Sequence, residues 1–350
     1  MKGVLYDVRW IGNHGIGRFA QELANRFTGF APFDRKRRPW HPLDPVLLGA
    51  ELWATRTNLF FSPGYNSPVG WPGQFIFTLH DLNHLRVPGN SNALKRSYYS
   101  RLIRPACRRA SVVLTVSEYS RNEIAEWAEV DAHKIINVGN GVGPPFGITG
   151  DKHEPGYPYL LYVGSRKPHK NLRRLLQAYT ISGIAECLVL VLSGVADPNT
   201  LAQIRALGLE GKVVFLPLDT TEELGCAYRG ATGFVFPSLY EGFGLPPLEA
   251  MACGVPVLTS NACSLPEVAG DAALLVNPLE VEEIAAGLTR LATDSELRTQ
   301  LRKKGLERAQ KFSWDETARR VANAIAFAAG GTAAGEFSTL QKGVDELLSK

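Results

Sequence analysis

Short apolar runs alternate along the chain with amphipathic helical stretches, and this alternation restricts the fold more than any other feature of the sequence. Each run ends in polar or turn residues, which is typical of a buried strand followed by a loop. Strands of a parallel sheet are covered by helices on both faces and are therefore almost continuously apolar, as these runs are. We expect strands within residues 3–11, 58–63, 74–81, 111–117, 159–165, 187–194, 212–217, 233–238, 256–260 and 273–278.

Residues 143–158 are rich in Gly and Pro and separate the pattern into two blocks, so we interpret them as a linker. The 350 residues fit two domains at a typical size of about 150 residues each. We predict an α/β protein with two doubly wound, Rossmann-like domains, residues 1–150 and 157–313, followed by a flexible tail at 330–350. Ligands of such sheets bind outside the carboxyl ends of the strands, so functional residues should directly follow the strands.

The composition is that of a soluble globular protein, with 45% hydrophobic and 21% charged residues. The formal net charge of +4 is too small to indicate a nucleic-acid partner. Five cysteines without a C-x-x-C pair favour a reducing compartment. Because no apolar run reaches the roughly 18 residues of a membrane-spanning helix, we expect a cytoplasmic protein whose membrane contact is at most peripheral.

The segment with the most functional signals is 238–261, which follows an expected strand. Glu241 lies in the loop at the strand end, and Glu249 lies in the first turns of a helix that ends before Gly254. Two carboxylates placed in this way can bind the hydroxyl groups of a sugar. The alternative is a surface helix with two solvated glutamates, which leaves the rest of the segment unexplained.

Glycines and prolines between the two carboxylates favour an anion site. Gly242 and Gly244 let the backbone pass close to a ligand. Pro246 and Pro247 suit the first turn of a helix, where an amide donor is not needed. Since the amides and the positive end of a helix N-terminus attract anions, the segment fits a phosphorylated sugar.

A cationic loop follows another expected strand, within residues 162–176. The strand ends at Gly164, a helix begins near Asn171, and Arg166 and Lys170 lie between them. Cations in a loop at a strand end can clamp a diphosphate without a metal. The alternative is an ordinary basic helix start.

His80 ends the expected strand at 74–81 and should point toward the ligand-binding edge of the first sheet. The alternative is a histidine that supports the loop by hydrogen bonding. His84 follows four residues later, as in a zinc-binding helix, but Asp81 replaces the glutamate of that motif and His80 leaves a strand. We predict no zinc here, because no third ligand is apparent.

Gly15 and Gly17 precede a helix within residues 12–23 and suggest a phosphate-facing turn. The chain has no G-x-x-x-x-G-K-[ST] loop, which argues against hydrolysis of a nucleoside triphosphate, and no D-x-D, the commonest metal–diphosphate signature in sugar transfer. The G-x-G-x-x-G fingerprint is missing after the first strand, which disfavours a dehydrogenase.

The first half carries two basic features. Residues 35–38 read Arg-Lys-Arg-Arg, and residues 95–109 hold six basic residues and no acidic one. Arg101, Arg104 and Arg108 fall on one helical stripe. The stripe fits anionic lipid headgroups or a lipid-diphosphate acceptor; a solvated helix face is the alternative.

Taken together, these segments resemble the bacterial nucleotide-sugar glycosyltransferases of family four. That family has the GT-B fold, in which two Rossmann-like domains face each other across a cleft. The resemblance extends from about residue 3 to about residue 328 and is most specific at 162–171 and 238–257. Residues 312–325 resemble the family's closing helix, which crosses back onto the first domain.

The resemblance implies a role for each candidate residue. Lys170 would hold the diphosphate, with help from Arg166, because Ser165 stands where the family often has arginine. Glu249 would bind the ribose hydroxyls, and Glu241 would contact the donor sugar and take part in catalysis.

Further roles follow from the same resemblance. His80 would act between acceptor and donor, and Gly15 would lie near the diphosphate. The backbone amides that contact the donor would come from Gly242, Phe243, Gly244 and Leu245.

The reaction implied is the transfer of a sugar with retention of configuration, without a metal or other cofactor. We expect GDP-mannose as the donor, because the segments YDVRW and HDLNHLRVP resemble mannosyltransferases of bacterial surface-polysaccharide and lipopolysaccharide assembly. The acceptor would be a saccharide or a lipid-linked saccharide at the inner face of the plasma membrane. No residue stands out as a covalent nucleophile, which favours attack from the face that the diphosphate leaves.

Two other functions use the same nucleotide-sugar site. A sugar-nucleotide epimerase on a similar fold would need no acceptor, and a non-catalytic scaffold would bind the donor without turning it over. The GFGLPPLE segment argues against the epimerase. The presence of His80, Lys170, Glu241 and Glu249 argues against the scaffold.

Overall fold

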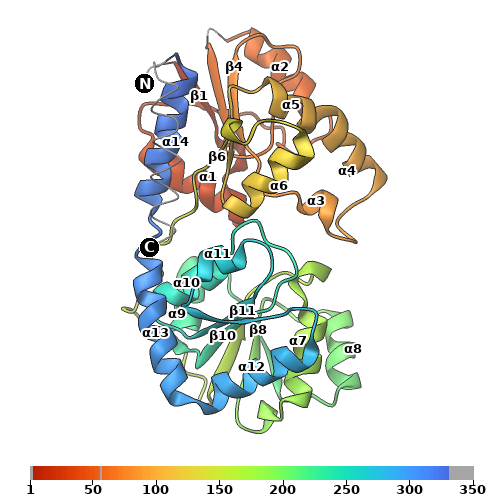
Figure 1. Ribbon diagram of the computed structural model, residues 1–350, viewed down its shortest axis with the longest axis vertical. Coiled ribbons are helices and arrows are strands. Elements are labelled where there is room, and N and C mark those ends of the chain that lie inside the picture. The colour runs from red at the N-terminus through yellow and green to blue at the C-terminus, as the bar shows by residue number, and fades with distance from the viewer. Residues whose placement is uncertain (1–2, 56, 331–350) are drawn as a thin grey trace. The chain divides into compact units, whose positions relative to one another are not determined.

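The computed structural model describes residues 3–55 and 57–330, which divide into two compact units (Figure 1). The first unit contains the described residues up to Gly141 and those from Ser313 onward, and the second is continuous from Val142 to Phe312. Except for residue 330, the predicted tail at 330–350 lies outside the described residues.

The stretch 143–158, which we expected to link the domains, belongs to the second unit. Arg229 explains why, since its guanidinium donates to the carbonyl oxygens of Asp151 at 2.7 Å and of Pro145 at 3.1 Å. The ring of Phe146 also packs edge-on against Tyr228, at 5.9 Å between centroids. These contacts fasten the stretch along the second unit.

The first unit is built on a six-stranded sheet in the order β2-β1-β3-β4-β5-β6, and every pair of neighbouring strands is parallel. Its strands are β1 (Val4–Asp7), β2 (Ala31–Phe33), β3 (Leu59–Ser62), β4 (Gln74–Thr78), β5 (Val112–Thr115) and β6 (Ile135–Asn137). Strand β1 is shorter than the run at 3–11, because the Asp7 carboxylate accepts from the Arg9 amide and turns the chain into a 3-10 helix. Strand β2 was not predicted; it is a three-residue edge strand that contains Pro32.

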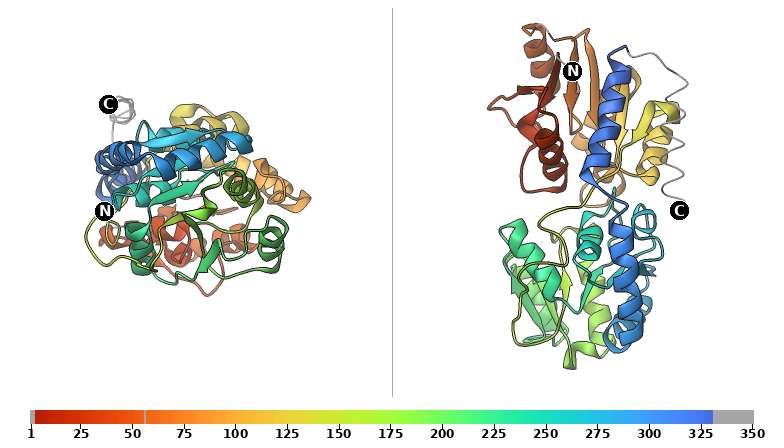
Figure 2. Two further views of the ribbon diagram at one scale, coloured as in Figure 1. Left: turned by 90° about the horizontal axis from the view of Figure 1, so that it is seen from below. Right: turned by 90° about the vertical axis from the view of Figure 1, so that its left-hand side faces the viewer.

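Helices cover both faces of this sheet (Figures 1 and 2). On one face lie α1 (Gly15–Arg26) and α14 (Trp314–Ala328), where the Tyr6 hydroxyl donates to the Ala20 carbonyl oxygen and Trp314 meets Phe19. The other face packs against side chains of α2 (Asp44–Trp53), α5 (Arg104–Arg109) and α6 (Glu118–Ala128). The remaining helices of the unit are α3 (Asn83–Arg86) and α4 (Ala93–Tyr98), the latter joined to α5 by a π-helical turn, Tyr99–Ile103.

The second unit repeats the architecture with a parallel sheet in the order β12-β11-β10-β7-β8-β9. Its strands are β7 (Tyr159–Tyr162), β8 (Val189–Ser193), β9 (Val213–Leu216), β10 (Gly233–Phe236), β11 (Val257–Ser260) and β12 (Ala273–Val276). Its helices are α7 (Leu172–Ile181), α8 (Pro198–Ala206), α9 (Thr221–Gly230), α10 (Leu245–Ala252), α11 (Leu265–Ala269), α12 (Val281–Thr293) and α13 (Ser295–Ala309). Each run predicted as a strand in this half contains one of these strands.

Alternate side chains of β10 reach the two faces of this sheet. Val235 joins a core cluster with α7 and α12, while Phe234 meets Tyr228 of α9 edge-on at 5.3 Å. The α/β class with two parallel sheets is thus confirmed. Since β7 and β10 are neighbours, the loops that follow them leave the same edge of the sheet, and these loops carry the predicted donor-binding residues.

Candidate active site

Lys170 and Glu241 form an ion pair in the second unit, with 2.7 Å between Nζ and Oε1. Lys170 ends a 3-10 turn, Pro168–Lys170, after β7, and Glu241 follows the neighbouring strand β10. The ammonium also lies 4.9 Å from the ring centre of Phe236, the last residue of β10. Two residues 71 positions apart in the chain, each predicted to bind the donor, therefore meet directly.

Asn171 fixes the backbone next to Lys170. It adopts a left-handed conformation with φ of 59°, and its buried amide nitrogen donates to the carbonyl oxygens of Pro237 at 2.9 Å and Pro278 at 2.7 Å. The Tyr162 hydroxyl donates to the Lys170 carbonyl oxygen at 3.2 Å. Neither Asn171 nor Tyr162 was predicted as a site residue. The available signal was an asparagine at a helix start, because asparagine tolerates this conformation better than most residues.

Arg166 is held by the ends of two strands. Its guanidinium donates to the Gly164 carbonyl oxygen at 3.1 Å and to the Ser193 carbonyl oxygen at 2.7 Å, and it lies 3.5 Å from the Asp197 carboxylate. It therefore ties the loop after β7 to the end of β8. Its predicted contact with a diphosphate stays a prediction.

Ser264 holds the backbone of the loop from Glu241 to Gly244. The Ser264 hydroxyl lies 2.9 Å from the carbonyl oxygens of both Glu241 and Phe243. Gly244 has φ of 112°, and a Cβ there would lie 2.6 Å from a methyl group of Leu265. Only glycine fits this position, because both the backbone conformation and the neighbouring side chain exclude a larger residue.

Helix α10 begins at Leu245 with two prolines, Pro246 and Pro247, in its first turn, as predicted. Neither proline has an N–H group, so any amide donors at this helix start come from Leu245 and the residues before it. The segment 242–245 therefore leads directly into the positive end of this helix. The helix is followed by Gly254, with φ of 72°.

Glu249 extends from α10, and its Oε2 accepts a hydrogen bond from the Tyr228 hydroxyl at 3.2 Å. Tyr228 lies fully buried on α9. Burial raises the pKa of Tyr228 well above its usual value, and the nearby Glu249 charge raises it further. The hydroxyl therefore stays protonated and donates to the carboxylate. Sequence reasoning missed Tyr228, because it lies on a helix without a motif.

His80 follows β4 in the first unit, where its Nε2 lies 2.9 Å from the Pro63 carbonyl oxygen and its ring meets Phe19 edge-on at 5.0 Å. A carbonyl oxygen can only accept, so Nε2 carries the proton and donates. Burial lowers the pKa of His80 to about 4, against the opposing effect of the Pro63 hydrogen bond. At neutral pH the ring is uncharged and its Nδ1 is an acceptor.

The start of α1 differs from the prediction, because Gly15 and Gly17 lie inside its first turn rather than before it. His14 is the N-cap, and its Nδ1 accepts from the Gly17 amide at 2.9 Å. A Cβ at Gly17 would lie 2.1 Å from the Gly12 carbonyl oxygen, whereas a Cβ at Gly15 would have no atom within 4 Å. Packing thus requires glycine at 17 but not at 15.

The remaining predictions concern a zinc site at His84, the basic stripe and membrane-spanning helices. The Nδ1 of His84 lies 2.9 Å from the Tyr99 hydroxyl. Within residues 3–55 and 57–330, no three His, Cys, Asp or Glu side chains group as a metal site. In the basic stripe, Arg104 and Arg108 both pair with Glu129. No helix in the described part of the chain is long and apolar enough to cross a bilayer.

Comparisons with known proteins identify the family of the chain. A family model described as Glycosyltransferase Family 4 matches residues 5–144, and one described as Glycosyl transferases group 1 matches residues 150–308. O-antigen chain mannosyltransferase B of Escherichia coli is 34% identical over 291 residues, which cover 78% of this chain and 76% of the relative. The serotype-specific mannosyltransferase WbdA of Escherichia coli is 31% identical over 268 residues, which cover 71% of this chain and 32% of WbdA.

Solved structures share the fold. Sucrose-phosphate synthase from Thermosynechococcus elongatus superposes with a TM-score of 0.78 at 18% identity, covering 95% of this chain and 100% of that one. The GT-B fold expected from the resemblance is confirmed. By its sequence relatives and its two family models, this chain belongs to the glycosyltransferases of family four.

Proposed function

We propose that this enzyme transfers mannose from GDP-mannose, with retention of configuration, to a saccharide or lipid-linked saccharide in the assembly of a bacterial surface polysaccharide. The sugar and the pathway are supported by relatives named as O-antigen mannosyltransferases. The donor site is supported above all by the ion pair of Lys170 and Glu241 at the carboxyl edge of the second sheet.

The ion pair supports a mechanism without a metal. Breaking the bond between sugar and diphosphate leaves negative charge on the diphosphate, and preorganised cations and amides can stabilise that charge. Lys170 would turn from Glu241 to the phosphate oxygens, helped by the amides of 242–245. The Glu241 carboxylate would then be released to accept from a hydroxyl of the donor sugar.

Glu249 would bind the ribose hydroxyls of the nucleotide. The Tyr228 hydroxyl occupies its Oε2 and restricts the rotation of the carboxylate. Asn171 and Ser264 would keep the two donor loops in place through their backbone contacts. These residues position the site without touching the substrate.

His80 would supply a neutral acceptor for a sugar hydroxyl, since its pKa of about 4 leaves Nδ1 unprotonated at pH 7. The acceptor proton would pass to the departing phosphate on the same face. A trapped covalent adduct between sugar and enzyme would contradict this same-face route.

A thermal-shift and nucleotide-release panel tests the donor. GDP-mannose, UDP-glucose and UDP-N-acetylglucosamine are each added to the wild type, to Glu249→Ala and to Glu282→Ala. Glu282 is an exposed glutamate on α12, so its variant is the matched control. We expect GDP-mannose to raise the Tm of the wild type and of Glu282→Ala but not of Glu249→Ala. Slow release of GDP without an acceptor should accompany the shift.

Other outcomes of this panel separate the alternatives. Stabilisation by a UDP-sugar alone would contradict GDP-mannose as the donor. Binding with neither hydrolysis nor transfer would favour the scaffold. Conversion of the donor sugar without an acceptor would favour the epimerase.

A further inference from the structure

Helix α2 presents an apolar face to solvent. Leu43, at its N-cap, is 59% exposed, and Val46 and Trp53 on the same side of the helix are 55% and 63% exposed. Leu47 is 40% exposed on this side as well. Surface helices normally turn their polar side outward, so this helix has the opposite orientation.

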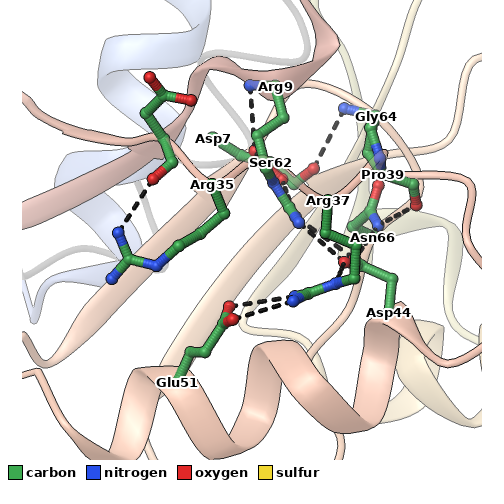
Figure 3. Close-up of polar contacts among 11 residues, drawn as sticks. Asp7, Arg9, Arg35, Arg37, Pro39, Asp44, Glu51, Ser62, Gly64 and Asn66 are labelled. Atoms are coloured by element: carbon green, nitrogen blue, oxygen red, sulfur yellow. Dashed lines mark hydrogen bonds and ion pairs between the residues drawn. The ribbon is translucent and has the colours of Figure 1, made fainter.

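The charged groups of this region lie on the inner side of the helix, opposite its exposed apolar side chains (Figure 3). Asp44 is fully buried and accepts from Arg9 and from Arg37, each at 2.7 Å. Arg37 also pairs with Glu51 at 2.8 Å, and Arg9 pairs with Asp7 at 2.7 Å. Because a buried carboxylate without partners is costly, this network fixes which side of α2 faces inward.

Close backbone packing fixes the same orientation independently. A Cβ at Gly49 would lie 1.9 Å from the Val69 carbonyl oxygen, and the Val69 amide donates to the Pro45 carbonyl oxygen at 2.8 Å. The helix cannot rotate to bury its outer side chains, because Gly49 and Pro45 already touch the chain beneath. The apolar side chains therefore remain exposed in the first unit.

The apolar face continues onto neighbouring segments. Val69 is 39% exposed next to Pro45, and the Trp53 indole donates to the Gly70 carbonyl oxygen at 2.9 Å. Trp40 precedes the helix and is 51% exposed. The Arg38 guanidinium lies over its ring, 5.8 Å from the ring centre. Two exposed tryptophans thus flank the aliphatic side chains.

Basic residues lie in the segment that precedes α2, and Arg38 of this segment lies against Trp40. Arg35, Lys36 and Arg38 are all exposed, with Asp34 as the acidic residue among them. In the other basic candidate, the stripe of Arg101, Arg104 and Arg108, two arginines share Glu129 and Arg101 is exposed. Exposed positive charge thus lies close in the chain to the exposed apolar residues of α2.

We propose that this surface binds the headgroup region of an anionic lipid bilayer. Aliphatic side chains would enter the bilayer boundary, tryptophans favour the interface, and basic residues attract anionic headgroups. A second copy of the chain fits less well, because a twofold interface would bring the two basic segments together. We call the proposed lipid-binding surface the α2 face. It consists of Trp40, Leu43, Val46, Leu47, Trp53 and Val69, together with the basic residues Arg35, Lys36 and Arg38.

Co-sedimentation with vesicles tests the proposal on the full chain. The wild type should bind vesicles of phosphatidylglycerol and phosphatidylcholine at low salt, and pure phosphatidylcholine less. Val46→Ser with Leu47→Ser should weaken binding about tenfold or more, and Lys36→Ser with Arg38→Ser about tenfold at low salt. Both double variants should keep the wild-type Tm and the wild-type thermal shift with nucleotide sugar, since neither touches the donor site.

Matched variants elsewhere control for hydrophobicity and charge. Val195 and Leu279 are exposed on the second unit, at 73% and 58%, and Val195→Ser with Leu279→Ser should bind like the wild type. Arg104→Ser with Arg108→Ser should also bind like the wild type. Equal loss of binding in these controls would overturn the assignment to the α2 face.

Brominated acyl chains give a readout that a structural change would not mimic. They should quench the fluorescence of the wild type and quench Trp40→Phe with Trp53→Phe less. Absence of wild-type binding to anionic vesicles would overturn the proposal. A concentration-dependent dimer that Val46→Ser with Leu47→Ser abolishes, without lipid binding, would assign the face to a second copy and overturn it as well.

Discussion

At the scale of single residues, Lys170 is the side chain on which the proposed mechanism depends most. Its ammonium neutralises Glu241 at 2.7 Å and is the cation expected to stabilise the leaving diphosphate. Lys170→Met should lower kcat about 10²–10³-fold, as loss of one preorganised donor does in other enzymes. Steady-state rates measure this, with Lys212→Met as the control because Lys212 pairs with Glu186 on the surface. An unchanged kcat would remove Lys170 from the reaction.

Tyr228 is expected to act through Glu249. Tyr228→Phe removes the hydroxyl that donates at 3.2 Å and should raise the KM for the donor about three- to tenfold, with a smaller change in kcat. The control is Tyr159→Phe, since the Tyr159 hydroxyl is also buried but donates to the Ala227 carbonyl oxygen at 2.7 Å. Both variants should lose some stability. Equal effects on KM in the two variants would show that Tyr228 is merely structural.

His80 makes stability depend on pH. Its pKa of about 4 lies below the usual value of 6.5, so between these values the unfolded chain binds more protons than the folded one. The free energy of unfolding should therefore fall as the pH falls from 7, by on the order of 2 kcal/mol at pH 5 from this residue. Urea midpoints at several pH values measure how the free energy of unfolding depends on pH. This dependence should be shallower in His80→Gln and unchanged in His133→Gln, because His133 is exposed. The same slope in His80→Gln would contradict a neutral buried ring.

At the scale of elements, the start of α1 holds two glycines, of which packing requires only Gly17. Gly17→Ala should lower the Tm, because its Cβ would overlap the Gly12 carbonyl oxygen at 2.1 Å. Gly15→Ala should not lower the Tm, since nothing lies within 4 Å of the added Cβ, but should weaken donor binding at the predicted phosphate-facing turn. Thermal melts with and without GDP-mannose distinguish the two variants. Full donor binding by Gly15→Ala would contradict the role expected for this turn.

Among the elements, those with a strong local pattern were predicted and those fixed by contacts were not. The apolar runs of β7, β10 and β11 and the two prolines of α10 are visible in the chain itself. Strand β2 has three residues and owes its existence to pairing with β1. The orientation of α2 was not predictable, because its buried Asp44 finds its cationic partners 35 and seven positions away.

At the scale of the whole molecule, the C-terminal helix returns to the first unit. Trp314 meets Phe19 at 6.5 Å between centroids, and Val321 and Ile325 of α14 are fully buried. A chain that ends at residue 312 should lose on the order of 5 kcal/mol from the first unit, at about 1.5–3 kcal/mol for each buried side chain. Since this approaches the whole stability of a typical domain, the first unit should unfold while the second, continuous from 142 to 312, stays folded.

Hydrogen exchange resolves this prediction unit by unit. Amides of β4 and β5 should exchange quickly in the shortened chain, and amides of β10 and β11 should stay protected. A chain that ends at residue 330 keeps α14 and serves as the control. Continued protection of β4 and β5 would show that the first unit does not need the helix.

Patterns within the chain were sufficient to predict two parallel α/β sheets, the loops after their strands, the glycine and proline positions of 242–247, and the residue types Lys170, Glu241 and Glu249 that fit a nucleotide sugar. Short-range patterns carry this information, because apolar periodicity and turn residues act over a few positions. Long-range packing set four other features: the pairing of Lys170 with Glu241, the hydrogen bond from the Tyr228 hydroxyl to Glu249, the neutral ring of His80, and the outward apolar side of α2. Each of these depends on which distant groups surround a side chain, and burial and pairing are settled only when the sheets and helices pack.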